Sequence, residues 1–297
     1  MKPFLKWVGG KTTLLSDLQS HFPKKIRNYY EPFIGGGSVF LMLMNSEDIV
    51  VKRFYLNDKN AHLINVYKCI QNNIEELNTK LKALHNTYHK AEMIEQPKRH
   101  AHVFNEKWTI NDIVKKGKSY VYYHYRNVFN EHKSGSVEEA ALFIFLNKTC
   151  FRGLFREGKN GFNVPFGHYK NPKIFIDLMP YHKLFTKHNI TFSAFDYKIF
   201  LKKRKITKKD FVYMDPPYIP VNKTSFVDYN KQGFNHDELI ELCNTMKNVS
   251  FVQSNSYCDK TKNGYKAFQQ HHVVTKRRIN SKNPGSKIKE IMIVNTS

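Results

Sequence analysis

One stretch decides the fold class that we predict: Asp210-Phe211-Val212-Tyr213-Met214-Asp215-Pro216-Pro217-Tyr218. Its apolar residues favour a buried β-strand, and the prolines must end that strand at Met214 or Asp215 because proline cannot continue a sheet ladder. The next side chains then lie at the carboxyl edge of the sheet, where open α/β sheets bind ligands. An acid, an outward-pointing carbonyl and a ring at this edge suit a planar ligand with an amino group, such as a nucleobase. A plain strand exit with a surface acid is the alternative.

The charge of the chain indicates a polyanionic partner. Lysine and arginine number 48 against 25 acidic residues, which gives a formal charge of +23, and nucleic acid is the leading candidate. A surplus that serves solubility, or an anionic membrane surface, is the alternative, although no basic amphipathic helix with an aromatic stripe stands out. With 297 residues and 41% hydrophobic content, the chain can bury a substantial core in one or two domains.

The cysteines and the apolar runs bear on where the protein works. None of the four cysteines belongs to a C-x-x-C pair, so we expect neither a zinc site nor a disulfide framework, and a reducing compartment fits best. Residues 1–11 contain no apolar signal region, and the longest apolar run, Ala140 to Leu146, is too short to span a membrane. We therefore expect an intracellular protein in a compartment that holds DNA, such as the cytoplasm and nucleoid or a viral replication site.

A glycine cluster predicts a small-molecule site. It lies in the run Tyr29-Tyr30-Glu31-Pro32-Phe33-Ile34-Gly35-Gly36-Gly37-Ser38. Adjacent glycines permit a tight turn with a ligand close to the backbone, and a helix that begins at Ser38 supplies N–H donors. Their spacing does not match the G-x-G-x-x-G of dinucleotide binding. A second strand at 53–57 ends in Asp58, a place where an acid typically accepts hydrogen bonds from a ribose, and a helix N-cap is the competing role.

The turn Lys6-Trp7-Val8-Gly9-Gly10-Lys11-Thr12 resembles a phosphate-binding loop only in part. Leu5 stands where that loop needs its first glycine, so the cradle for phosphates is not encoded. What remains is a flexible turn with a cation, Lys11, and an indole, Trp7, which suits the carboxylate and the plane of a small ligand. A turn that merely opens a helix is the alternative.

The middle of the chain predicts a helical insertion. Apolar residues from Ile74 to Tyr88 step by three and four, as in an amphipathic helix, whereas 92–119 is polar and irregular. Ser136 and Glu139 are spaced as a capping box that opens an apolar helix. Arginines and rings then interleave over 151–156 and 162–170, a mixture that suits nucleic acid. A solvated loop packed by its own aromatics is the alternative.

The last third of the chain supplies the remaining strands. We expect strands at 190–197, 250–254, 271–276 and 290–295. The last two of these are expected to form an antiparallel pair. The strand at 190–197 ends at Asp196 and Tyr197, a further acid and ring at a sheet edge, and Asn235 should cap a helix. The polar segment 220–233 is long enough to be a mobile cover over an active site.

These motifs together resemble the Dam family of DNA adenine-N6 methyltransferases, in which a glycine motif comes first, a recognition domain second and D-P-P-Y last. The resemblance extends over nearly the whole chain and rests on the stretches at 4–11 (FLKWVGGK), 31–40 (EPFIGGGSVF), 162–167 (FNVPFG), 215–218 (DPPY) and 254–256 (SNS). It implies an α/β fold with a Rossmann-like sheet that binds S-adenosylmethionine and an inserted, mainly helical DNA-recognition domain. Residues 1–60 and 171–297 would form the catalytic domain, and 61–170 the insertion.

The resemblance also implies the chemistry. Asp215 and Pro216 would hold the amino group of a flipped adenine, Pro217 would stiffen the turn, and Tyr218 would stack on the base. S-adenosylmethionine would bring the methyl group, so no metal is needed. The residues that would hold this cofactor are Trp7, Lys11, Phe33, Ile34, Gly35, Gly37, Ser38, Asp58, Asp196 and Tyr197. The competing interpretations are an N4-cytosine methyltransferase, which usually has serine in place of Asp215, and a catalytically silent DNA-binding protein.

Double-stranded DNA would be the partner. The residues that match the recognition positions of the family are Lys6, Phe151, Arg152, Leu154, Arg156, Pro165, His168 and Tyr169. Lys6 and Arg156 would contact bases of a GATC-like site, and Phe151 would act as a wedge beside the vacated position. Arg152 replaces a usual asparagine and His168 a usual arginine, so the match to GATC is incomplete. The basic run 276–278 would add phosphate contacts.

Overall fold

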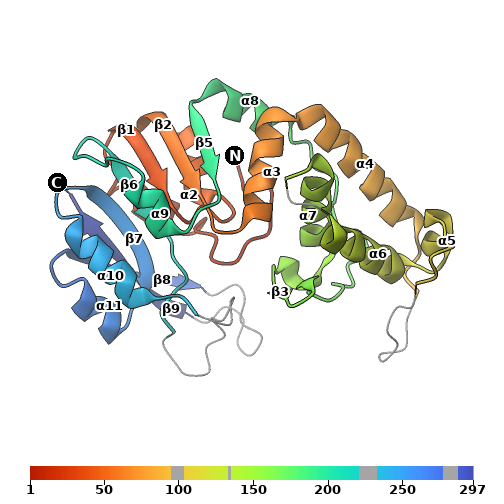
Figure 1. Cartoon of the computed structure of the whole chain (residues 1–297). Coiled ribbons are helices and arrows are strands. Elements are labelled where there is room, and N and C mark those ends of the chain that lie inside the picture. The colour runs from red at the N-terminus through yellow and green to blue at the C-terminus, as the bar shows by residue number, and fades with distance from the viewer. Residues whose placement is uncertain (95–103, 133–134, 221–232, 277–286, 297) are drawn as a thin grey trace. The chain divides into compact units, whose positions relative to one another are not determined.

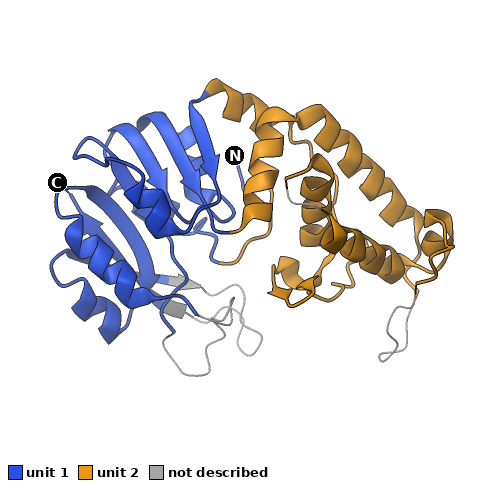
Figure 2. Cartoon of the chain, in the orientation of Figure 1, with its two compact units in different colours: residues 1–2, 9–59, 188–297 blue, residues 3–8, 60–187 orange. Residues whose placement is uncertain are grey.

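The computed structural model describes residues 1–94, 104–132, 135–220, 233–276 and 287–296, and its chain forms two compact units (Figure 2). Unit 1 comprises residues 1–2, 9–59 and 188–297, and unit 2 comprises 3–8 and 60–187. Unit 2 thus extends to Lys187, past the Lys170 at which we expected the insertion to end, because Phe185 is buried with its ring 6.3 Å from that of Tyr67.

Unit 1 is built on one sheet of seven strands in the order β5-β2-β1-β6-β7-β9-β8 (Figure 1). The strands are β1 Lys25–Glu31, β2 Val50–Asn57, β5 Ile190–Ser193, β6 Phe211–Met214, β7 Ser250–Ser256, β8 Gln269–Lys276 and β9 Lys287–Asn295. The helices of this unit are α1 Leu15–Gln19, α2 Ser38–Met44, α9 Tyr197–Lys202, α10 His236–Thr245 and α11 Asp259–Gly264. The first five strands of that order are parallel, while β9 runs antiparallel to both β7 and β8. The expected α/β sheet and its antiparallel pair are confirmed.

Both faces of this sheet are covered, and two adjacent tyrosines of β1 mark them. Successive side chains of a strand point to opposite faces. The ring of Tyr29 lies 5.8 Å from that of Phe54, which in turn lies 5.6 Å from Phe40 of α2. Tyr30 packs on the other face within the cluster that contains Phe200 of α9 and Leu239 of α10. A continuous apolar run such as β6 is therefore buried on both sides, as parallel strands require.

The strand order places a topological switch point between β1 and β6. From β1 the chain adds β2 and β5 on one side, then returns to add β6 and β7 on the other. The carboxyl ends of β1 and β6 therefore diverge around one crevice, the place where such sheets bind ligands. The strand predicted to end at Met214 does so. The strand expected at 190–197 is wrong in its second half, because Asp196 accepts a hydrogen bond from the N–H of Lys198 and caps α9.

Unit 2 is mainly helical, and α7 is its centre. Its elements are α3 Ala61–Asn72, α4 Ile74–Lys90, α5 Ile110–Lys115, α6 Lys118–Glu131, α7 Val137–Thr149, the 3₁₀ turn η1 Phe151–Gly153, the short strands β3 Glu157–Gly158 and β4 Gly161–Phe162, and α8 Met179–Lys187. Residues 139–147 of α7 are all buried, and α3, α4 and α6 pack against this helix. A helix surrounded in this way has an apolar surface all round, as the sequence of α7 does.

Two expectations for unit 2 need correction or refinement. The segment 92–119 is not irregular throughout, because Thr109 and Asp112 form a capping box that begins α5. Ser136 does cap α7 by accepting the N–H of Glu139, but the Glu139 carboxylate accepts hydrogen bonds from Asn65 and from the N–H of Gly135 instead of completing a box. Over the described residues, no helix is long and apolar enough to cross a membrane.

Candidate active site and nucleic-acid interface

Asp215 is carried by β6 to the switch-point edge, where it contacts a lysine. The Nζ atom of Lys11 lies 2.7 Å from Asp215 Oδ1 and also donates to the carbonyl of Gly9 at 2.8 Å. Burial raises the pKa of the Asp215 carboxyl to about 6, even though Lys11 acts to lower it. The same ammonium lies 4.7 Å from the centre of the Tyr218 ring. Lys11, which we expected in the cofactor pocket, therefore joins the acid and the ring of the D-P-P-Y segment.

Two neighbouring strands hold the turn that follows Asp215. Asn255, at the end of β7, accepts the N–H of Ile219 through Oδ1 at 3.1 Å. Glu290, near the start of β9, accepts the Tyr218 hydroxyl through Oε2 at 2.6 Å. Our sequence reasoning assigned no role to either residue. The sequence signal for Asn255 was the polar triplet 254–256 at the end of a fully buried strand. A buried amide needs hydrogen-bond partners, so this triplet indicates a structural role.

The glycine turn after β1 is tied to the acid after β2. Gly35 and Gly37 have φ angles of +48° and +71°, a region that favours glycine. The N–H of Gly35 donates to Asp58 Oδ2 at 3.0 Å. The alternative role of Asp58 as a helix cap is wrong, because Asn60 caps α3 by accepting the N–H of Leu63. The predicted pairing of glycine turn and acid is therefore present in the fold.

A buried amide that we did not predict, Asn57, joins the exits of β1 and β5. Its Nδ2 donates to the carbonyls of Pro32 at 3.1 Å and of Phe195 at 2.9 Å. Its backbone carbonyl accepts the N–H of Ile34 at 2.9 Å, directly before the glycine turn. Asn57 thereby brings the segment after β5 to the same edge as the glycine turn.

Two of the rings expected to hold a cofactor, Phe33 and Tyr197, lie together at this edge. The ring of Phe33 lies 5.3 Å from that of Tyr197, and Ser38 begins α2 immediately after the turn. Trp7 belongs to unit 2 instead, where its indole lies 6.2 Å from Phe143 and 6.3 Å from Phe155. The chain passes from unit 2 to unit 1 between Val8 and Gly9, so Trp7 and Lys11 are described with different units.

Unit 2 gathers most of the residues predicted to contact DNA. The Nζ atom of Lys6 lies 4.2 Å from the centre of the Tyr169 ring, and the Tyr169 hydroxyl accepts the N–H of Arg152 at 3.1 Å. The N–H of Phe151 donates to the carbonyl of Pro165 at 2.8 Å. Phe151, Arg152 and His168 are exposed, so cations and rings face solvent together.

Two of these residues, at which the chain departs from the family pattern, have unusual backbone conformations. Arg152 and His168 have φ angles of +57° and +56° and are the non-glycine residues with positive φ in the described chain. Asparagine, the usual residue in place of Arg152, tolerates this left-handed region better than most residues do. The departure at Arg152 therefore costs some backbone strain and gains a cation, which lies 5.1 Å from the ring of Phe151.

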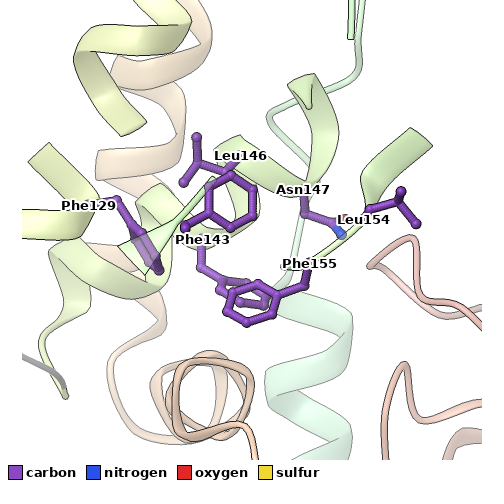
Figure 3. A pocket seen from close by; sticks show the side chains of 7 residues that line it. Phe129, Phe143, Leu146, Asn147, Leu154 and Phe155 are labelled. Atoms are coloured by element: carbon purple, nitrogen blue, oxygen red, sulfur yellow. The ribbon is translucent and has the colours of Figure 1, made fainter. Parts of the chain in front are cut away.

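Asn147 holds the backbone of Lys6, whose ammonium contacts the Tyr169 ring. Its Oδ1 accepts the N–H of Lys6 at 2.9 Å, and its Nδ2 donates to the carbonyl of Lys6 at 2.7 Å and to that of Gly153 at 3.2 Å. Figure 3 shows Asn147 beside Leu154 and near a group of phenylalanine rings. The small cavity there, about 10 Å³, leaves room for no more than about one water. We take the cavity to be a packing gap around Asn147 rather than a ligand site.

A charged cluster beside the β3–β4 hairpin involves His62 of α3. Nδ1 of His62 contacts Glu139 Oε1, and Nε2 lies 3.2 Å from Glu157 Oε1. Burial acts to lower the pKa of His62, but the hydrogen bonds and charges of the two carboxylates outweigh it and raise the pKa to about 9. Arg156, which precedes the hairpin, donates from Nε to Asn163 Oδ1 at 2.6 Å.

Two expectations fall outside the described residues. These are the cover over the active site, at 221–232 within the expected segment 220–233, and the basic residues Arg277 and Arg278.

Known proteins resemble this chain over nearly its full length. Residues 7–279 match the family model of the D12 class N6 adenine-specific DNA methyltransferases. The chain is 37% identical to the type II methyltransferase M.MjaIII of Methanocaldococcus jannaschii, with 99% of each protein covered. It is 32% identical to the type II methyltransferase M1.LlaDCHI of Lactococcus lactis, over 99% of this chain and 95% of that protein. It is 30% identical to a DNA adenine methylase of Escherichia coli, over 94% of this chain and 90% of that protein.

Proposed function

The chain belongs to the D12 class N6 adenine-specific DNA methyltransferase family, and we propose that its residues 215–218 activate the amino group of an adenine flipped out of double-stranded DNA. The observation that carries this assignment is Asp215 itself, a partly buried acid at the switch point whose turn is fixed from β7 and β9. The methyl donor would be S-adenosylmethionine.

The amino nitrogen of adenine is a poor nucleophile because its lone pair is delocalised into the ring. Hydrogen bonds from this group to the Asp215 carboxylate and the Pro216 carbonyl would localise the lone pair on nitrogen. Unstacking the base costs about a few kcal/mol, and stacking on Tyr218 would offset part of that cost. Asp215 must be ionised to accept its hydrogen bond from the amino group well, so activity should fall as the pH drops through about 6.

The other half of the site fits S-adenosylmethionine, which supplies a sulfonium methyl group when bound. The turn of Ile34, Gly35 and Gly37 lets a ligand approach the backbone, and Asp58 offers a carboxylate to ribose hydroxyls. Phe33 and Tyr197 offer rings to the adenine plane of the cofactor, with Asp196 and Ser38 adjoining. We keep Lys11 at the boundary between the cofactor site and the base site because it contacts Asp215. A cofactor contact from Trp7 stays a prediction.

Unit 2 would read the DNA. Lys6 and Arg156 would contact base edges in a GATC-like site, and the exposed ring of Phe151 would wedge beside the flipped position. Leu154, Pro165 and Tyr169 would line the same surface, and Arg152 and His168 would contact bases or phosphates there. The net charge of +23 supports the phosphate contacts that bring the duplex to this surface.

One assay tests the proposal. The protein is incubated with labelled S-adenosylmethionine and two duplexes, one with GATC and one with that word altered, and the labelled nucleoside is identified after digestion. N6-methyladenine in the GATC duplex alone is the expected result. Asp215→Ala should reduce transfer by about a thousandfold, whereas the exposed acid Asp48, changed to alanine, serves as the matched control. No label in DNA would refute the enzyme, and N4-methylcytosine would refute the adenine assignment.

A further inference from the structure

The last strand of the sheet delivers a side chain to the catalytic edge. Because β9 runs antiparallel to β7, its beginning lies at the edge where β7 ends, and Glu290 pairs with Ser256 there. On its other side Glu290 pairs with Val273 of β8. The residue is only 9% exposed, so its carboxylate is held largely out of water at the edge that carries Asp215.

The contacts of Glu290 and Lys11 hold the Tyr218 ring at two places. The hydroxyl donates to Glu290 Oε2 at 2.6 Å, a length typical of hydrogen bonds to a charged acceptor. The ammonium of Lys11 lies 4.7 Å from the ring centre while it also contacts Asp215. Since Asn255 holds the next backbone N–H, both ends of the Tyr218 side chain are restrained before any base arrives.

We propose that Glu290 is a positioning residue for methyl transfer, which anchors the hydroxyl end of the Tyr218 ring and places a second negative charge near Asp215. The inference rests on the function proposed above, in which Tyr218 stacks on the flipped adenine. A ring fixed in advance loses little freedom when the base stacks on it, and small misplacements of reacting groups are costly in rate.

The charge of Glu290 also affects Asp215. Among the described residues, the charged or titratable groups that interact with Asp215 are Lys11, Tyr29, Glu31, Tyr213, Tyr218 and Glu290. Burial is the main reason why the pKa of Asp215 is raised, Lys11 opposes it, and Glu290 raises it further. Removing the charge of Glu290 should therefore lower the pKa of Asp215 and extend activity to lower pH.

Two substitutions separate the two parts of this role. Glu290→Gln keeps an oxygen that can accept the Tyr218 hydroxyl but removes the charge. Tyr218→Phe removes the hydroxyl and keeps both the ring and the charge. The measurement is kcat/KM for DNA methylation between pH 5 and 9, since its pH dependence reports groups of the free enzyme. Glu241→Gln, the same change at an exposed position of α10, is the control.

We expect Glu290→Gln to shift the acid limb of the profile downward by about half a pH unit. Tyr218→Phe should lower kcat/KM by about tenfold and leave the acid limb in place. A Tyr218→Phe enzyme with wild-type kcat/KM, or a Glu290→Gln enzyme with an unshifted acid limb, would overturn the inference. If Glu290→Gln fails to fold by thermal unfolding, Tyr218→Phe alone decides. A wild-type protein that does not methylate adenine would instead refute the function, so the two failures are distinguishable.

Discussion

The charge on His62 should make the stability of unit 2 depend on pH. Both ring nitrogens contact carboxylates, which requires the doubly protonated ring because a neutral imidazole has one donor. Replacing His62 by glutamine leaves one uncharged amide nitrogen for the two acids. Glu139, which is 1% exposed, would then remain buried without its cation.

The size of the effect follows from the pKa. A change in the pKa of His62 from 6.5 in the unfolded chain to about 9 in the folded one corresponds to at most about 3.5 kcal/mol, since a tenfold change in proton affinity is worth about 1.4 kcal/mol. The ring is 26% exposed, so we discount this for solvent screening and expect about 1–2 kcal/mol. Because the folded pKa is the higher one, the contribution is complete below about pH 6.5 and is lost as the pH rises through 9.

The assay is urea denaturation of the wild type and of His62→Gln at pH 6.5, 8.0 and 9.5. The wild type alone is ambiguous, because burial and the charges of Lys6 and Lys173 lower the pKa of Lys148 to about 8. That lysine makes stability rise with pH between its folded and unfolded pKa values, against the trend from His62. The difference between the two proteins cancels the effect of Lys148, so the gap in unfolding free energy should close as the pH rises.

The control is Glu157→Gln, which removes only the charged contact between His62 and the β3–β4 hairpin and keeps the contact between His62 and Glu139. The difference in unfolding free energy between the wild type and Glu157→Gln should be smaller, and it should also decrease as the pH rises. A gap between wild type and His62→Gln that is equal at pH 6.5 and pH 9.5 would refute the reasoning, because it would mean that the ring does not carry its charge in the folded protein.

Other substitutions test the remaining contacts. Asp58→Ala should weaken S-adenosylmethionine binding by about tenfold, because a ribose loses its acceptor and the N–H of Gly35 its partner; calorimetric titration measures this. Asn147→Leu should lower the free energy of unfolding by about 2–4 kcal/mol, since the peptide groups of Lys6 lose their partners; a loss under about 0.5 kcal/mol would show that water replaces them. Arg156→Ala should cost about 1–3 kcal/mol of discrimination at one base pair, measured by competition binding, whereas equal weakening on all sequences would assign it to a phosphate.

The strands and their edge could be predicted because the relevant signals are local. The prolines after Asp215 must end β6, and the glycines after β1 must turn the chain, whatever lies elsewhere in the molecule. The buried amides could not be assigned in this way. Asn57 bonds to a carbonyl 25 positions away, Asn255 to an N–H 36 positions away, and Asn147 to a peptide 141 positions away. Nothing next to these residues in the sequence identifies their partners.

The assignment of Trp7 and Lys11 to different units also depends on long-range contacts. The two residues are close in the sequence, and this favours one ligand turn. The segment 3–8 belongs to unit 2 because Phe4 packs against Tyr67 and Tyr181 and because Asn147 holds Lys6. These long-range contacts assign 3–8 to unit 2, and the chain re-enters unit 1 at Gly9, which has a φ of +81°.

The path of the chain also sets an order of assembly during synthesis on the ribosome. Lys6 is made long before its partner Asn147, and β9 must enter the sheet between β7 and β8, which are both made earlier. Domains generally fold as units once their residues have emerged. Because Glu290 lies on β9, a nascent chain that stops before this strand lacks the anchor of Tyr218. A prematurely terminated product that lacks β9 should therefore methylate DNA more slowly than the full chain.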